Sequence, residues 1–445
     1  MDLQSTQASE ERFKSYIEDL ASVIGHEDRK EPLCDYSRGL LTASGRKSVE
    51  PLAAVTAPSR VAAKHQSLLH FVGQAPWSDV VILNKVRERI QPVMERQEPI
   101  LAWIIDDTGF PKKGKHSVGV ARQYCGQLGK QDNCQNAVSL SIANHQASLP
   151  IGYRLYLPKE WAVDMARRKK AGVPTEIQFK TKSAIAIDLL KQAITQGVAV
   201  GTVLGDSAYG IDTAFRDAVT KLGLVYALGT GPSTGIWAPG TAPLPPKKRQ
   251  GRGRKPTRPR HAGKNKPVSV KALAVNLPKR DWKTITWREG VDKDLTSRFA
   301  RVRVRPARGY TLDKPRPDEW LLIEWPEDEA APTKYWLSTL PKNMAFDKLI
   351  DTVKLRWRIE RDYQELKQEV GLGHYEGRSW RGFHHHATLC IAAYGFLISE
   401  TETIPPSGYT LIRKLEKPAL PQSYQPRGAT PSSRTPRGEL HRQHA

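Results

Sequence analysis

Two apolar runs in this chain each end in aspartate close to a glycine, and this pattern limits the folds that the chain can adopt. Residues 99–107 read PILAWIIDD, and residues 198–206 read VAVGTVLGD. A continuous apolar run of this length is typical of a strand that is buried on both faces. Helical patterns alternate with such strands here, which predicts a mixed α/β core. If both strands belong to one sheet, their carboxylates can meet at one edge of it.

A helical segment further along the chain supplies a third carboxylate. Within the helical pattern of residues 343–370, Arg356, Glu360 and Lys367 lie at offsets of 0, 4 and 11. At about 100° per residue, these three side chains share one face of a helix. The apolar stripe lies elsewhere around the helix, so the helix can bury that stripe and still direct Glu360 into a cleft. A solvated face of salt bridges is the alternative interpretation.

Three carboxylates from separate elements are the donors that a two-metal phosphodiester-cutting site requires. Mg²⁺ prefers carboxylate and water oxygens, and paired ions lie about 4 Å apart. We expect Asp107, Asp206 and Glu360 to be the catalytic and metal-binding acids, with two Mg²⁺ or Mn²⁺ ions. Side chains alternate along a strand, so only one of Asp106 and Asp107 should face the site. We favour Asp107, which directly precedes Thr108, although an exposed turn acid is the alternative for each aspartate.

The net charge of the chain indicates a partner that is rich in phosphate. Lysine and arginine total 69 against 46 acidic residues, which gives a formal net charge of +23 in 445 residues. Such an excess favours nucleic acid as the phosphodiester. We expect Lys112, Lys113, Arg378, Trp380 and Arg381 to contact DNA, since cations beside an aromatic suit backbone contact and base stacking. Trp380 could equally be a core residue.

Other kinds of site are not indicated by the sequence. The four cysteines show no CxxC pairing, which argues against a zinc site or a disulfide framework and suits a reducing cytoplasm. Consecutive histidines at 384–386 point about 100° apart on a helix and cannot share one ion well, so a helix start or a phosphate contact is expected there. The polar N-terminus is unlike a signal peptide. The apolar stretch 387–398 is too short to cross a bilayer, so we expect no membrane partner.

Changes of composition divide the chain into parts. Residues 1–97 read as all helix, either a DNA-binding module or a plain helical cap on the larger domain. Residues 98–227 and 341–402 are expected to form the α/β core. Between them, residues 228–340 read as a basic linker plus a β-rich insertion, with strands expected at 271–287, 298–304, 320–325 and 334–340.

Two segments lack the apolar residues that a packed structure needs. Residues 245–271 are basic and rich in Gly and Pro, and they are either a solvated linker or an arm that follows a phosphate backbone. Residues 403–445 are rich in Pro, Ser and Arg without periodicity, and we expect them to be disordered.

Taken together, these motifs resemble bacterial insertion-sequence transposases of the DDE superfamily, close to the IS-four-like group. IDDTGFPKKGKHSVGVARQYCG resembles the first-Asp region of that family, LGDSAYG resembles its second, and RWRIERDYQELKQEVGLGHYEGRSW resembles the segment with its catalytic Glu. The signature of the group is Y-x2-R-x3-E-x6-K. Arg356, Glu360 and Lys367 match it, while Val353 stands at the Tyr position and leaves any role of that tyrosine unassigned.

The resemblance implies a ribonuclease H-like core that a β insertion interrupts between the second Asp and the Glu. It also implies an endonuclease that cuts DNA at terminal inverted repeats and joins the freed 3′ ends to target DNA, by cut-and-paste through a hairpin. Arg356 and Lys367 would hold DNA phosphates near the scissile bond. The family's tryptophans assist base flipping, which needs an aromatic to replace lost stacking. In the insertion, Trp237, Trp320 and Trp325 are either core residues or candidates for stacking on DNA.

Assembly and location follow from the same resemblance. Synapsis of two DNA ends implies a homodimer, and DNA as partner implies a cytoplasmic, nucleoid-associated protein. Two rival interpretations stay open: a catalytically silent DNA-binding regulator derived from such an element, and a general RNA-binding protein. A complete set of three acids argues against the first, and no RNA-binding signature supports the second.

Overall fold

The chain folds as a mixed α/β protein, which confirms the fold class expected from its sequence. The computed structural model describes residues 3–248, 251–252, 259–263, 265–288, 295–309 and 315–403. Nearly all of the tail expected to be disordered, and parts of the basic segment 245–271, lie outside the described residues. None of the described helices is long and apolar enough to span a bilayer.

Helices make up the N-terminal region, as its periodicity predicts. They are α1 (Leu3–Ala21), α2 (Lys30–Thr42), α3 (Val49–Thr56), α4 (Val61–Gly73) and α5 (Asp79–Glu95). The apolar stripe of α1, which begins at Phe13, is buried. Ser78 accepts the N–H of Val81 and thereby caps the first turn of α5.

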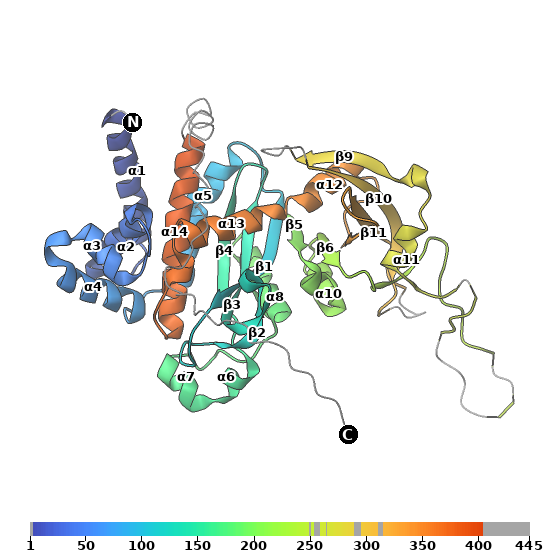
Figure 1. Cartoon of the computed structure of the whole chain (residues 1–445), viewed down its shortest axis with the longest axis horizontal. Helices are drawn as coiled ribbons and strands as arrows, with labels where there is room; N and C mark the ends of the chain where they lie inside the picture. The colour runs from blue at the N-terminus through green and yellow to red at the C-terminus, as the bar shows by residue number, and fades with distance from the viewer. Residues whose placement is uncertain are drawn as a thin grey trace, which may run out of the picture. The chain divides into compact units, whose positions relative to one another are not determined.

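The helix α14 (Trp380–Thr403) joins the N-terminal helices to the rest of the core. Residues 382–396 of this helix are all buried, so it lacks the polar face of a surface helix over that length. Tyr16 of α1 donates a hydrogen bond to the carbonyl of Ala392 at 2.8 Å. α14 lies beside α1 and α5 (Figure 1), and one hydrophobic cluster includes residues of all three helices. The N-terminal helices are therefore packed into the main core.

The core strands form a mixed sheet. β1 (Ala102–Pro111), β5 (Thr202–Gly205) and β6 (Tyr226–Thr230) run parallel, β3 (Lys130–Ala143) pairs antiparallel with β1, and β2 (Ala121–Cys125) and β4 (Ser148–Leu155) pair with β3. The apolar run before the first aspartates thus becomes β1, and the run before Asp206 becomes β5, next to each other. Parallel pairing requires a long crossover connection, and β2, β3, β4 and the helix α8 (Lys182–Thr195) form part of it.

Helices cover both faces of this sheet. On one face, Leu189 of α8 (Lys182–Thr195) lies against Gly152 of β4. On the other face, the hydroxyl of Tyr363 in α13 (Trp357–Gln368) lies 2.7 Å from the hydroxyl of Ser139 in β3. α8 and α13 therefore mark the two faces.

The β-rich insertion continues the core sheet and does not form a separate one. β12 (Lys334–Ser338) pairs with β6, and β11 (Glu319–Pro326), β10 (Leu295–Pro306), β7 (Gly235–Trp237) and β8 (Val268–Ser269) follow in that order, with β9 (Lys283–Arg288) paired to β10. The strand expected over residues 271–287 is wrong in its first part. Val270–Val275 form the helix α11, whose first turn is capped by the Ser269 hydroxyl.

The helical segment expected over residues 343–370 is two helices, α12 (Phe346–Lys354) and α13. A buried ion pair connects α12 to the insertion, because Lys354 Nζ lies 2.6 Å from Glu324 Oε2 of β11. Lys354 Nζ also lies 3.9 Å from the centre of the Trp287 ring. Burial lowers the pKa of Lys354 to about 8, and the carboxylate of Glu324 opposes that effect.

This ion pair leads to a prediction about stability. Glu324→Leu leaves the Lys354 ammonium buried without its partner and should lower the free energy of unfolding by about 3–5 kcal/mol. The double variant Glu324→Leu/Lys354→Leu should lose much less, because no charge is left unpaired. Urea unfolding measures both, with Glu327→Leu, which removes an exposed acid nearby, as the control. Equal losses in the single and double variants would contradict this account.

Candidate active site

The alternation of side chains along β1 determines which of its two aspartates faces α13. Ile104 packs in the hydrophobic cluster that contains Ile359 of α13. Asp106 follows two residues later and so lies on the same face. Asp107 lies on the opposite face, where its Oδ2 accepts a hydrogen bond of 2.5 Å from Lys182 Nζ of α8.

Asp206 lies level with Asp106 on the neighbouring parallel strand. In the register of β1 and β5, Ile104 pairs with Leu204. Two residues further along, each strand reaches its aspartate. Asp206 is also the N-cap of the short helix α9 (Ser207–Gly210), where its Oδ1 accepts two backbone N–H groups at 2.9 and 3.4 Å. Strand pairing and the cap together fix the position of this carboxylate.

The glycine of the LGDSAYG motif is required by close packing. Gly210 ends α9, and a Cβ atom at this position would overlap the carbonyl oxygen of Gly229 in β6. Only glycine lets α9 approach β6 so closely. The motif therefore positions Asp206 through backbone contact as well as through the strand.

Arg356, at the start of α13, lies between the acids of the sheet and the acid of the helix. Its Nη2 lies 3.7 Å from Asp106 Oδ2, and its Nη1 donates a 3.0 Å hydrogen bond to Glu360 Oε1. Burial raises the pKa of Asp106 to about 7; Arg356 opposes this rise, and the negative charge of Asp206 adds to it. The Glu360 side chain is 71% exposed. Arg356 therefore offsets only part of the effect of burial on the Asp106 carboxylate.

A cavity of about 370 Å³ opens between the core and the insertion, over Asp206 and Glu360. Its lining combines the two acids with cations and three tryptophans from β9, β12 and α13. The chemically distinctive members are Asp206, Glu360, Lys354, Arg356, Trp287, Trp336 and Trp357. Acids for metal, cations for phosphate and aromatic faces for bases therefore share one cavity.

The structure brings together only part of the expected set of acids. Asp206 and Glu360 line one cavity, but Asp106 and not Asp107 faces them, because α13 packs on the face of β1 that carries Asp106. Within the described ranges, no three His, Cys, Asp or Glu side chains are grouped closely enough to hold a metal ion. Glu360 is bound by Arg356 and stays apart from the two aspartates.

Residues 19–294 match the family model of the DDE superfamily endonucleases, which covers more than half of the chain. The chain belongs to this family. A protein named "Probable transposase for insertion sequence element IS701", from Microchaete diplosiphon, is 35% identical over 145 residues. That alignment covers 33% of this chain and 35% of the relative, so the chain spans about a third of the relative that it matches. The family match includes both strand aspartates and ends before α13.

Lys367 lies on α13 two helical turns beyond Glu360. Its Nζ donates to the carbonyl of Gly109 in β1 at 3.0 Å and lies 3.4 Å from Gln127 Oε1. Burial lowers its pKa to about 8. The cation that matches the last position of the DDE group signature thus lies beside the end of β1, on the helix that carries Glu360.

Two residues expected to contact DNA are packed into the protein. Lys112 Nζ donates to the carbonyl of Tyr375 at 2.7 Å, and burial lowers its pKa. Trp380 is 8% exposed, and its ring centre lies 4.4 Å from that of His384. Trp380 is therefore placed as a core residue, which is the alternative to a DNA contact that its sequence left open.

Three other residues expected to contact DNA are exposed. Lys113 and Arg378 extend into solvent, and Arg381 does so while donating to the carbonyl of Gln74 at 2.6 Å. The backbone N–H of Val118 donates to the carbonyl of Arg378 at 3.0 Å, which holds the loop after β1 against the loop before α14.

The three consecutive histidines are core residues of α14. His384 accepts the N–H of Leu155, whereas His385 bonds the carbonyl of Trp77. The histidines lie near the start of α14, which confirms the helix-start alternative, and all three side chains are 6% exposed or less, which excludes the phosphate alternative. Their ring nitrogens bond separate parts of the chain, in agreement with the expectation that they do not share an ion.

The aromatic residues of the cavity were missed by sequence reasoning. Trp237 and Trp320, considered for DNA stacking, are buried, and Trp325 packs against Trp282 with ring centres 5.3 Å apart. Trp287 and Trp336 come to the cavity only through the pairing of β9 with β10 and of β12 with β6. The position of Trp357 near the site could have been predicted, since it directly follows Arg356 in the motif.

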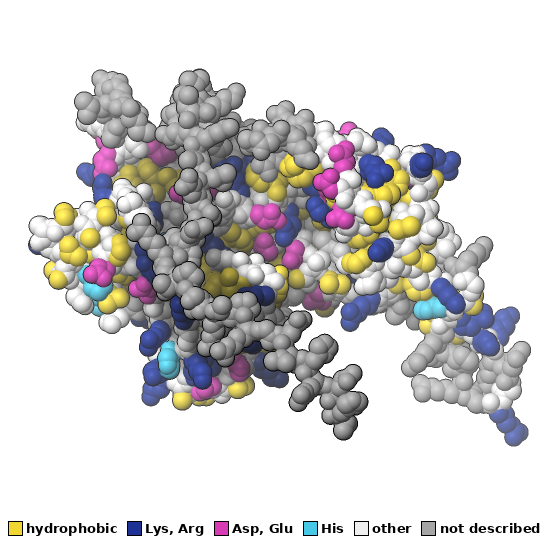
Figure 2. Space-filling view, viewed as in Figure 1, with side chains coloured by type: hydrophobic (Ala, Val, Ile, Leu, Met, Phe, Trp, Pro, Cys, Tyr) yellow, Lys and Arg dark blue, Asp and Glu magenta, His cyan; other side chains and the backbone are white. Residues whose placement is uncertain are grey.

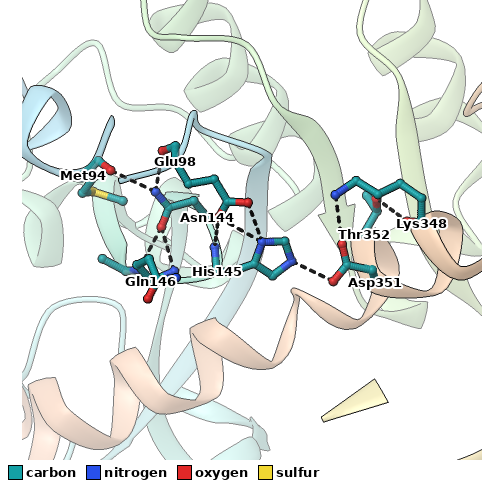
Figure 3. Close-up of polar contacts among 9 residues, drawn as sticks. Met94, Glu98, Asn144, His145, Gln146, Lys348, Asp351 and Thr352 are labelled. Atoms are coloured by element: carbon teal, nitrogen blue, oxygen red, sulfur yellow. Dashed lines mark hydrogen bonds and ion pairs between the residues drawn. The ribbon is translucent and has the colours of Figure 1, made fainter. Parts of the chain in front are cut away.

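A histidine between two carboxylates holds α12 to the sheet. His145, in the turn between β3 and β4, has its Nδ1 2.8 Å from Glu98 Oε1 and its Nε2 2.7 Å from Asp351 Oδ1 of α12 (Figure 3). Two carboxylates as partners require both ring nitrogens to donate, so the ring is an imidazolium. Burial alone lowers the pKa of His145, but the bonds to Glu98 and Asp351 outweigh it and raise the pKa.

This network leads to a prediction about pH. The raised pKa means that the stabilisation is complete below about pH 6.5, the ordinary histidine value, and is lost as the pH rises through the higher value of the folded protein. The free energy of unfolding should therefore fall from pH 6 to pH 9 more steeply in the native chain than in His145→Gln. Urea unfolding across this range measures the difference, and His70→Gln, which changes an exposed histidine, should keep the native slope. Parallel curves for all three proteins would contradict the assignment.

Proposed function

We propose that this chain is an insertion-sequence transposase that cuts DNA at terminal inverted repeats and joins the freed 3′ ends to target DNA. The observation that carries the proposal is the placement of Asp106 and Asp206 on adjacent parallel strands, with Glu360 on the helix that covers them. The family to which the chain belongs and the name of its relative point to the same activity.

The acids fit Mg²⁺ or Mn²⁺ in kind, since hard cations prefer carboxylate oxygens. We propose Asp106, in place of Asp107, as the partner of Asp206 and Glu360 in holding two such ions. Asp106 is buried beside the like charge of Asp206, and Arg356 compensates only part of the effect, so a divalent cation would offset the rest. Holding an ion with all three acids requires Glu360 to give up its bond to Arg356. Bound divalent ions would supply water activation and charge stabilisation at the phosphate.

The cations of α13 are placed to hold the DNA backbone. Arg356 has a buried Nε without a hydrogen-bond partner among the described residues, so its guanidinium has capacity for a phosphate. Lys367, two turns further along α13, would hold a second phosphate. Together they orient the scissile bond toward the acids, and no proton transfer is required of either.

The tryptophans of the cavity suit a base that has left the helical stack. Trp287 and Trp336 line the same cavity as Asp206 and Glu360. An aromatic face replaces the stacking that a flipped base loses. We propose these two residues as the stacking partners in the hairpin route, in place of the tryptophans considered from the sequence.

A catalytically silent DNA-binding regulator is the second candidate. It is favoured by the Arg356–Glu360 bond and by the lack of a preformed three-acid cluster in the described part of the chain. In either case we propose DNA as the partner and a cytoplasmic, nucleoid-associated location. For the transposase we also propose a homodimer at the synapsis of two ends.

Variants of the acids separate the two candidates. The assay is magnesium-dependent nicking of a plasmid that carries the gene with its flanking DNA. Asp206→Asn and Glu360→Gln should each reduce cleavage by about 100-fold or more, because each removes charge stabilisation from the transition state. DNA binding, measured by fluorescence anisotropy, should persist. Absence of cleavage by the native chain would favour the silent regulator.

The same assay decides between the two aspartates of β1. Asp106→Asn should abolish cleavage, whereas Asp107→Asn should retain most of it, because Asp107 pairs with Lys182 on the other face. The opposite result would return the catalytic role to Asp107.

A further inference from the structure

A second group of cations lies outside the cavity, on the helices that follow β4. α6 (Lys159–Val163) and α7 (Met165–Ala171) lie beside the loop that follows β1. The α7 basic surface consists of the exposed lysines Lys113, Lys115, Lys159, Lys169 and Lys170. Figure 2 shows Lys and Arg side chains gathered over α6 and α7. None of these five lysines forms an ion pair with a described residue.

Specific contacts hold the two segments of this surface together. The guanidinium of Arg167 lies over the Trp161 ring, 3.7 Å from its centre, and donates to the carbonyl of Lys115 at 2.8 Å. The indole N–H of Trp161 donates to the carbonyl of Val120 at 2.8 Å. The loop after β1 is thus bonded to α7 at Lys115 and to α6 at Val120. Lysines from two separate segments are presented as one rigid surface.

Similar charges in such a surface repel one another, and the exposed Glu160 of α6 offsets only part of the repulsion among five lysines. The nearby Asp164 side chain is used as the N-cap of α7, where it accepts the N–H of Arg167. A polyanion removes this repulsion by neutralising several cations at once, with release of its counterions. The repeated phosphates of a nucleic acid backbone have that chemistry.

The surface is connected to the candidate active site through β1. Pro111 ends the strand five residues after Asp106, a distance of about 16 Å at roughly 3.3 Å per residue. That distance corresponds to about five base pairs at roughly 3.4 Å each. Lys367 donates a hydrogen bond to the carbonyl of Gly109, which lies between Asp106 and Pro111 on β1, and so adds a cation between the candidate active site and the α7 basic surface. Lys113 and Lys115 of the α7 basic surface follow Pro111 in the same loop, so a duplex whose phosphate lies at Asp106 can extend along β1 toward that surface.

We propose that the α7 basic surface binds the phosphate backbone of duplex DNA about half a helical turn from the scissile phosphate. The inference rests on the proposed function and adds a second contact region for the same DNA. The contact carries no sequence information, since it is made to phosphates. It fixes the direction in which the DNA leaves the cavity.

The test uses the full chain with the substitutions Lys169→Glu and Lys170→Glu together. The probe is a fluorescent 30-base-pair duplex of random sequence, whose anisotropy is measured over a series of KCl concentrations. Affinity at 100 mM KCl should fall about tenfold or more, and the slope of log K against log salt should become shallower by about 2, because each lost phosphate contact removes about 0.9. Lys169→Gln/Lys170→Gln should show a smaller loss in the same direction.

The control is Lys191→Glu/Lys221→Glu, which makes the same change of charge at exposed positions of α8 and α10 (Thr213–Lys221). Its affinity should stay within twofold of the native chain. Equal losses in both double variants, no loss in either, or a loss confined to a single-stranded RNA probe would each overturn the proposal.

The experiment distinguishes failure of the α7 basic surface from failure of the proposed function. A native chain that binds and nicks DNA, with Lys169→Glu/Lys170→Glu bound as tightly, rejects the α7 basic surface alone. A native chain that binds no duplex rejects both. Circular dichroism of each variant confirms that the fold is retained.

Discussion

The parallel pairing of β1 with β5 is the constraint on which the candidate site depends. It sets Asp106, in the middle of β1, beside Asp206, which directly follows the last residue of β5. Burial raises the pKa of Asp106, and the negative charge of Asp206 adds to the rise, so the two carboxylates are unfavourable there without a cation. Arg356 supplies part of the compensation in the free protein. The two adjacent carboxylates would therefore be stabilised by a further positive charge at this site.

The sequence predicted the elements of this site better than the orientation of one residue. Both aspartate-bearing strands and the face shared by Arg356, Glu360 and Lys367 follow from local pattern. The choice between Asp106 and Asp107 does not follow from local pattern. A strand buried on both faces carries apolar residues at every position, so its sequence does not show which residues point to which face. Only the packing of α13, through contacts such as Tyr363 with Ser139, decides it.

Features built from distant segments were the least predictable. Trp287 and Trp336 reach the cavity because strands of the insertion add to the core sheet, and their own neighbours in sequence carry no sign of this. The sequence favours a strand at Val270–Val275 because the segment is short and rich in β-branched and aliphatic residues, and its Ser269 cap is a weaker signal than a long periodicity. A further basic surface was missed because its lysines come from two segments that only tertiary contacts join.

The all-round burial of α14 limits how such proteins can diversify. Because this helix contacts α1 and α5 as well as the sheet, the N-terminal helices and the catalytic sheet share one interior. If the N-terminal region were exchanged between relatives, the new region would need a surface that packs against α14. Otherwise the apolar side chains of α14 would be exposed to water. Variation of the N-terminal region is therefore more accessible through point substitutions on its outer helix faces than by recombination of whole modules.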